Sequence, residues 1–199
     1  MIFSPVSRTP DVRRPKQLRI AIAKYLVKCG LADLSLRPLA KAVGSSPRGL
    51  LYHFGSKEKM VMEVLAELRR QQRAAYGQVE KKSVSEECRV IWKRMSAPDS
   101  EPYFRLFFEV YGIALRRPET YKDFLHNTME DWLQLITGGF VRDGYNRAEG
   151  RALATVILAG LRGFMLDFCT THDRRRVDRA VHLWLSGLDA ILSGARKKG

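Results

Sequence analysis

Apolar residues recur along the chain at spacings of three and four residues, which is typical of α-helices that bury one face. Near the N-terminus, one such stripe holds Leu18, Ile22 and Leu26, and Gly30 then marks the expected end of the helix. No segment alternates apolar and polar residues for long, as a half-buried strand would. The pattern therefore predicts an all-α fold.

Two short helices joined by a tight turn are expected next. The first lies between Ser35, which suits an N-cap, and Gly44, which suits a helix stop. The second opens with Ser46-Pro47, an N-cap followed by a proline at the first helical position, and runs to about His53. This arrangement predicts a helix-turn-helix. Because so short a helix is unstable alone, it needs a core, for which the candidates are Leu18, Ile22, Leu26, Leu36, Leu50 and Phe54.

The remaining chain is also predicted to be helical. A fourth helix follows Gly55-Ser56, and turn signals separate further helices over about 84–96, about 102–116, from Pro118 to near Gly144, over about 147–170 and over about 174–194. We therefore expect an N-terminal three-helix domain with a basic arm, residues 1–60, and a larger helical domain, residues 61–199.

Positive charge is concentrated in the first third of the chain. The formal net charge is +14, and residues 1–60 hold 12 Lys and Arg against three Asp and Glu. Such a cluster indicates a surface for nucleic acid or for an anionic membrane. The basic residues that precede or begin the first helix form either a DNA-contacting arm or a solvated tail: Arg13, Arg14, Lys16 and Arg19.

The exposed side of the second short helix carries side chains suited to DNA. Arg48 can donate two hydrogen bonds to a guanine edge in the major groove, while the Tyr52 hydroxyl and the His53 imidazole can reach phosphates. The whole expected surface of this helix is Ser46, Pro47, Arg48, Gly49, Tyr52 and His53.

The stretch from Leu18 to Leu65 resembles the DNA-binding domain of TetR-family transcriptional regulators. The matching residues are Ala21, Gly30, Ser35-Leu36-Arg37, Leu39-Ala40, Gly44, Ser46, Leu50, Phe54 and Lys57, with Met60 where leucine is usual. The resemblance implies that Ser35 and Arg37 begin a helix at the DNA backbone, with Arg37 also able to reach a base. It places Arg48 and Gly49 on the base-reading face.

By the same resemblance, Tyr52, His53 and Lys57 contact phosphate. The chain departs from the family pattern at Leu51, where a phosphate-binding tyrosine is usual, so Tyr52 is the candidate replacement. It also departs at Gly49, where the family commonly has a side chain on the reading face.

The resemblance further implies a cavity for a small effector in the larger domain. The residues expected to line it are mostly aromatic, which favours an apolar or aromatic effector: Phe104, Phe107, Phe108, Tyr111, Trp132, Phe164, Met165 and Phe168. The alternative is that the stripe at 104–111 is ordinary core. His126 and Asn127 are either polar partners of the effector or surface residues.

The last two predicted helices are apolar on both faces, so they should pack inward and also against a second copy. The resemblance implies a four-helix bundle between two chains. The expected interface residues are Val156, Gly160, Gly163, Val181, Trp184, Leu188 and Ile191.

Other chemistry finds little support in the sequence. Cys29, Cys88 and Cys169 are far apart, which fits a reducing cytosol and no disulfide framework. Cys169 lies near His172 and Asp173, but no fourth ligand is evident, so neither a metal nor a cofactor is expected. The chain shows no nucleophile setting and no glycine-rich phosphate loop, so no enzyme is expected.

The first 15 residues lack the apolar stretch of a signal peptide. The most apolar stretch, Ala152 to Cys169, is interrupted by Arg162 and Asp167, so a membrane span is not expected.

Together these features predict a cytoplasmic homodimeric transcription regulator, a repressor released from palindromic double-stranded operator DNA by a small effector. Two alternatives stay open. One is a basic protein that binds DNA without sequence preference or binds anionic membranes. The other is an enzyme whose basic domain is incidental.

Overall fold

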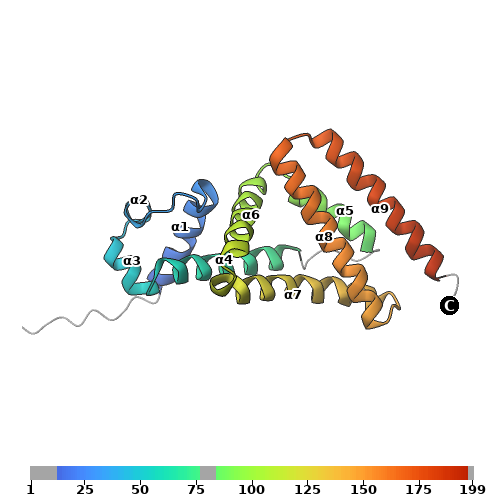
Figure 1. Cartoon of the computed structure of the whole chain (residues 1–199), viewed down its shortest axis with the longest axis horizontal. Coiled ribbons are helices and arrows are strands. Elements are labelled where there is room, and N and C mark those ends of the chain that lie inside the picture. The colour runs from blue at the N-terminus through green and yellow to red at the C-terminus, as the bar shows by residue number, and fades with distance from the viewer. Residues whose placement is uncertain (1–12, 77–83, 197–199) are drawn as a thin grey trace, which may run out of the picture. The chain divides into compact units, whose positions relative to one another are not determined.

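The computed structural model describes residues 13–76 and 84–196, and within this part of the chain every regular element is an α-helix. The predicted all-α fold is therefore confirmed. The chain divides into two compact units, residues 1–70 and 71–199 (Figure 1). The first unit reaches beyond the expected boundary at residue 60 because it includes the buried residues Val61, Val64 and Leu65.

The first unit contains α1 (Arg13–Cys29), α2 (Leu36–Ala42), α3 (Pro47–Phe54) and the beginning of α4 (Lys57–Tyr76). Of the six core residues expected from the sequence, four are buried, and Leu18 and Leu36 are half-buried. The buried side chains on the first three helices include Ile22, Leu26, Leu39, Ala40, Leu50 and Phe54. Burial of these side chains stabilises α2 and α3, which are too short to persist alone.

The turn between α2 and α3 is fixed by the backbone. Gly44 has φ of +65°, a left-handed conformation that glycine adopts without the steric penalty of a side chain. The Ser45 amide donates to the Ala40 carbonyl at 2.8 Å. Ser46 then caps α3, since its hydroxyl accepts from the Gly49 amide at 3.0 Å, and Pro47 is the first residue of that helix. These local bonds set the direction in which α3 leaves the turn.

The second unit contains α5 (Val84–Met95), α6 (Glu101–Arg116), α7 (Pro118–Arg142), α8 (Arg147–Thr171) and α9 (Arg174–Arg196), together with the end of α4. Helices α7 and α8 form a hairpin. The Asn146 side chain caps α8 by accepting from the amides of Ala148 and Glu149, each at 3.0 Å. Gly150 allows close packing, because a Cβ there would lie 3.1 Å from the Cβ of Phe140.

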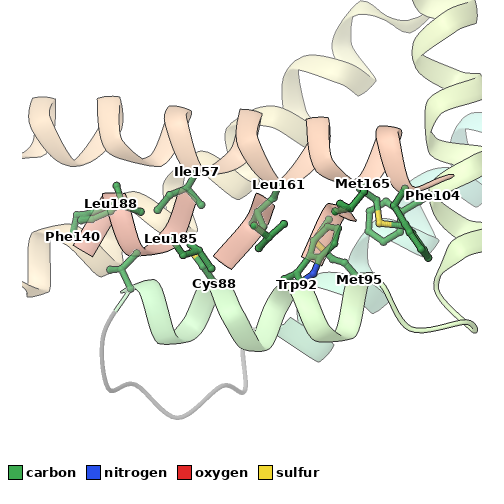
Figure 2. Close-up of a cluster of buried hydrophobic side chains, with 14 residues drawn as sticks. Cys88, Trp92, Met95, Phe104, Phe140, Ile157, Leu161, Met165, Leu185 and Leu188 are labelled. Atoms are coloured by element: carbon green, nitrogen blue, oxygen red, sulfur yellow. The ribbon is translucent and has the colours of Figure 1, made fainter. Parts of the chain in front are cut away.

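Helix α8 supplies the centre of the main core. Its residues Ile157, Leu161 and Met165 are buried and point toward α5, where Cys88 and Trp92 lie opposite them (Figure 2). By length and composition α8 could also cross a membrane. Core helices of soluble proteins pass the same test, and α8 buries these three side chains against α5, with 33% of its most apolar stretch buried in the chain.

Helix α9 lies along α8 and α5, and this contact corrects part of the predicted dimer interface. Val181 and Leu188 are buried in the core of a single chain. Gly160 and Trp184 contact each other within the chain, since a Cβ at Gly160 would lie 2.5 Å from an indole carbon of Trp184. Val181 and Leu188 therefore hold α9 in place within one chain, and the contact between Gly160 and Trp184 adds to the same packing.

Polar contacts complete the attachment of α9 to α5. The indole Nε1 of Trp92 donates to the Asp178 carboxylate at 2.8 Å, and Arg89 pairs with Asp189 at 3.0 Å. Arg174, in the first turn of α9, donates to the backbone carbonyl and side chain of Ser96 just beyond α5. The orientation of α9 is thus fixed by both apolar and directional contacts.

Replacing Gly160 with alanine should destabilise the protein. The added methyl group would overlap the Trp184 ring, and overpacking of this kind typically costs about 1–3 kcal/mol. We expect a lower midpoint in chemical denaturation. The matched control is Gly112→Ala on α6, where nothing lies within 4 Å of an added Cβ, so helix propensity should raise stability by up to about 1 kcal/mol. Equal effects of the two variants would contradict the Gly160–Trp184 contact.

Candidate nucleic-acid interface and ligand cavity

The outer side of the helix-turn-helix presents long polar side chains to solvent. Arg37 on α2 and Arg48 on α3 are exposed, as is His53 at the end of α3. Tyr52 is 87% exposed, and its ring meets the His53 imidazole edge to face, with centroids 5.6 Å apart. An exposed aromatic residue with no core contact suits a surface that becomes covered on binding.

Ser35, Ser46, Pro47 and Gly49 shape the helix ends. Ser35 occupies the N-cap position of α2, although its side chain makes no capping hydrogen bond. A Cβ at Gly49 would lie 3.0 Å from the Ser45 hydroxyl and 3.2 Å from the Ser46 hydroxyl. Glycine at this position therefore leaves room for the hydroxyl that caps α3.

Lys57 has a structural contact that sequence reasoning did not identify. It is half-buried at the start of α4, and its ammonium group donates to the backbone carbonyl of Leu34, just before α2. This contact ties the loop preceding α2 to α4. An ammonium group has three donors, so the same side chain retains hydrogens for a phosphate.

Leu51, which stands where the family pattern has tyrosine, is 39% exposed. Its neighbour Tyr52 is far more exposed and is the tyrosine on α3 that points into solvent. Of the basic arm, residues 1–12 and the side chains of Arg13 and Arg14 lie outside the described residues. Lys16 is exposed, whereas Arg19 pairs with Glu63 of α4 at 3.8 Å.

The second unit contains a cavity of about 170 Å³. An apolar cavity of about 150 Å³ is known to accept benzene, so this one has room for a single aromatic ring. Three residues expected to line a cavity do so, namely Phe104, Phe107 and Trp132. Helices α6, α7 and α8 all contribute to its wall.

The other five expected lining residues lie elsewhere. Met165 and Phe168 are buried in the main core, where α8 meets α9. Phe164 packs between Trp92 and Trp184, with ring centroids 6.3 Å and 5.4 Å away. The last two, Phe108 and Tyr111, pack behind the cavity wall, each against the ring of Phe107.

Helix α5 contributes a side of the cavity that sequence reasoning missed. Val84, Cys88, Ile91 and Met95 line it from this helix. Their spacing of four, three and four residues is the signal that could have revealed them, because it places all four on one helical face.

The polar groups of the cavity also differ from expectation. His126 and Asn127 are exposed and do not line it. The polar residues of the wall are instead Gln72, Glu87, Thr128, Arg142 and Arg162.

At the end of α8, His172 lies 3.6 Å from a Glu101 carboxylate oxygen. In residues 13–76 and 84–196, no group of three His, Cys, Asp or Glu is placed to hold a metal.

Helices α8 and α9 each carry apolar or small residues that are exposed in the single chain. Three of the expected interface residues are among them, Val156, Gly163 and Ile191. Sequence reasoning missed two further members, Leu166 and Leu183, which are 45% and 77% exposed. We call these five residues the outer strip.

The comparisons with known proteins agree with this architecture. Residues 21–64 match the family described as bacterial regulatory proteins, tetR family. No curated protein matches the chain. A solved transcriptional regulator from Rhodococcus shares 18% identity, covers 90% of this chain and 96% of its own, and has a TM-score of 0.75.

TetR regulators of known structure from two other organisms show the same fold. The one from Legionella pneumophila is 16% identical, with 93% of this chain and 99% of the other covered and a TM-score of 0.69. The one from Haloarcula marismortui is 14% identical, with 89% of this chain and 97% of the other covered and a TM-score of 0.73.

The surroundings of the cysteine side chains predict how fast each thiol reacts. Burial, followed by the nearby charge of Glu87, raises the pKa of Cys88 to about 12, and burial raises that of Cys169 to about 11. Both thiols therefore stay protonated and unreactive at pH 8, since the thiolate is the nucleophile. Exposed Cys29 should react first with a thiol reagent, as counted by mass spectrometry under native conditions. Early labelling of Cys88 would contradict its burial in the wall.

Proposed function

The chain belongs to the TetR family of bacterial regulatory proteins through its N-terminal domain, and from this we propose that it is a cytoplasmic dimeric repressor released from operator DNA by a small ligand. The observation that carries the proposal is a helix-turn-helix that holds Arg48, Tyr52 and His53 exposed on one short, capped helix.

Helix α3 is suited to enter the major groove. The turn at Gly44 and the Ser46 cap fix its N-terminal end, where Arg48 lies. An arginine on a recognition helix can form two hydrogen bonds with a guanine edge, which gives sequence preference. Tyr52, His53 and Lys57 follow, and we assign them to phosphates on either side of the groove.

The outer strip supports a dimer. Leu183 and Ile191 are large apolar side chains that remain 77% and 66% exposed in the single chain, and Val156 is 51% exposed beside them in the strip. Covering such surface on two copies removes apolar area from water, and a twofold interface uses the same patch on each. A dimer with twofold symmetry would present two α3 helices to half-sites about 34–36 Å apart.

Helix α4 offers a route for coupling the ligand to DNA. It begins in the first unit, where Lys57 holds the loop before α2, and ends in the second unit, where Gln72 lines the cavity. A ligand that changes the position of this helix would favour a state in which the two α3 helices of a dimer are placed differently for DNA binding. Couplings of about 1–3 kcal/mol are typical of such regulation.

Arg48→Ala should relax sequence preference, because removal of a bidentate guanine contact costs about 1–3 kcal/mol at one operator position. Binding to an operator selected from genomic fragments and to a scrambled duplex is compared across a salt series. Arg48→Ala should weaken binding to the operator more than to the scrambled duplex. Equal losses on both duplexes would show that Arg48 does not read a base.

Lys57→Ala should weaken binding to the operator and to the scrambled duplex about equally. It should also reduce the salt dependence of the binding constant by about one unit of log–log slope per half-site. It should also lower stability, because the Leu34 carbonyl loses its donor. Lys59→Ala, two residues along, is the matched control, since Lys59 is exposed. A wild-type protein without operator preference would favour a nonspecific basic protein, and unchanged binding in both the Arg48 and Lys57 variants would refute the DNA interface.

Charged residues in the outer strip should prevent dimerisation. Leu183→Glu with Ile191→Glu would place two carboxylates on each copy in an apolar contact, where desolvation is strongly unfavourable. Analytical ultracentrifugation at micromolar concentration should show a dimer for the wild type and a folded monomer for this variant. Leu115→Glu on α6, where the leucine is 81% exposed, should remain dimeric. A monomeric wild type would exclude the dimer.

A further inference from the structure

Arg162 is an unusual residue for the middle of an apolar helix. It lies on α8 in the cavity wall and is largely enclosed. Its guanidinium carbon lies over two aromatic rings, 5.4 Å from the centroid of Phe107 and 5.6 Å from that of Tyr111. One of its terminal nitrogens donates to the thioether sulfur of Met129. These neighbours hold the group in place, but none of them carries a negative charge at neutral pH.

No carboxylate within residues 13–76 and 84–196 forms an ion pair with Arg162. Two acidic groups on the adjacent helices are bound to other arginines. Glu130 on α7 makes two hydrogen bonds, of 2.7 Å and 3.0 Å, with Arg151, and Asp167 on α8 pairs with Arg176. Arg162 therefore forms no ion pair within this part of the chain, whereas these two neighbouring carboxylates do.

The guanidinium also has hydrogen-bonding capacity to spare. It carries five N–H donors, and its described acceptors are a thioether, which accepts weakly, and the Tyr111 hydroxyl. Burial lowers the pKa of Arg162, while Tyr111 and Tyr103 act to raise it. An arginine stays protonated at neutral pH, so the cavity wall contains a largely buried positive charge.

A buried cation without a partner is unfavourable for the empty protein. Packing alone does not explain it, because methionine or leucine would fill the same apolar surroundings without the desolvation penalty. The guanidinium fork does match the two oxygens of a carboxylate, and charge-assisted hydrogen bonds of this kind are among the strongest in proteins. The wall of the cavity thus combines an apolar, single-ring space with one fitted anion receptor.

The other charged residues of the wall restrict the net charge that the ligand can carry. Glu87 lines the cavity from α5, and Arg142 lines it from the exposed end of α7. A ligand with a second negative charge would meet Glu87, whereas a singly charged ligand can place its one anionic group on Arg162. The apolar residues Phe104, Phe107 and Trp132 remain for its body.

We propose that Arg162 binds the carboxylate of the effector and that the effector is a small aromatic or apolar monocarboxylic acid. This inference rests on the proposed ligand-regulated function, whose effector it assigns to a chemical class. Arg162 forms the bidentate contact, and the rings of Phe107 and Tyr111 hold the guanidinium plane toward the cavity.

The test compares acids with their neutral amides. Benzoate, phenylacetate and 1-naphthoate are titrated into the full-chain protein at pH 7.5 by isothermal calorimetry, each beside its primary amide of nearly the same shape. At least one acid should bind about tenfold or more tightly than its amide, because a hydrogen-bonded charge pair is replaced by a neutral contact. If no acid binds more tightly than its amide, the proposal is wrong.

Variants assign the preference to the residue. Arg162→Met should reduce the affinity of that acid to the level of the amide while leaving amide binding intact, which also shows that the cavity still forms. Arg151→Met is the matched control, because it removes an exposed cation from the same helix outside the cavity. An acid preference that survives in Arg162→Met would overturn the assignment.

A stability measurement tests whether Arg162 has a purely structural role. Without ligand, Arg162→Met and Arg162→Leu should melt at or above the wild-type temperature, since each removes an unpaired buried charge. A large loss of stability in both variants would mean that the guanidinium serves the fold, and the proposal would fail.

Release of labelled operator DNA separates this inference from the proposed function. Acids that bind through Arg162 without releasing operator would leave the inference standing and remove the regulatory role of the cavity. Aromatic probes that release operator with no preference for the acid would support regulation through the cavity and overturn the assignment of an acid to Arg162.

Discussion

Helix α8 has almost no polar side, and the second unit is arranged around this constraint. One side of the helix is covered within the chain, where Ile157, Leu161 and Met165 meet α5 and the other helices of the unit. Val156 and Leu166 on the same helix remain exposed. Since apolar area in water is unfavourable, a helix of this composition is stable in a soluble protein when neighbours surround it. Close packing of α7 and α9 covers part of this helix, and the proposed dimer would cover more of it.

Local signals made the first unit predictable. A glycine with positive φ at Gly44 and the Ser46-Pro47 start of α3 act within a few residues, so the sequence alone indicated where both helices end and begin. The orientation of α9 was predicted less well. Apolar residues cover more than half of its circumference, so Val181 and Leu183 look alike in sequence although one is 2% exposed and the other 77%. Which of them faces the core depends on contacts with α5 that are distant in sequence.

The cavity shows the same limit in another form. An aromatic stripe predicted that α6 would contribute, and Phe104 and Phe107 do line the space. Whether an aromatic side chain lines a void or fills it depends on small differences in helix position, because interiors are packed nearly to crystal density. Phe164 and Phe168, which resemble them in sequence, are packed against Trp92 and into the main core. No spacing rule distinguishes these two outcomes.

The small cavity itself supplies a physical reason for coupling. Pockets for drug-sized ligands measure about 300–1,000 Å³, whereas this one measures about 170 Å³. A single ring fits this volume as it stands, and a ligand shifts an equilibrium between two states only through a difference in its affinity for them. An effector larger than one ring must displace part of the wall. Ile157 and Leu161 on α8 are 1% and 4% exposed, whereas Gln72, near the end of α4, is half-buried. Under the proposed function, a larger acid is therefore expected to act more strongly on operator binding than a single-ring acid.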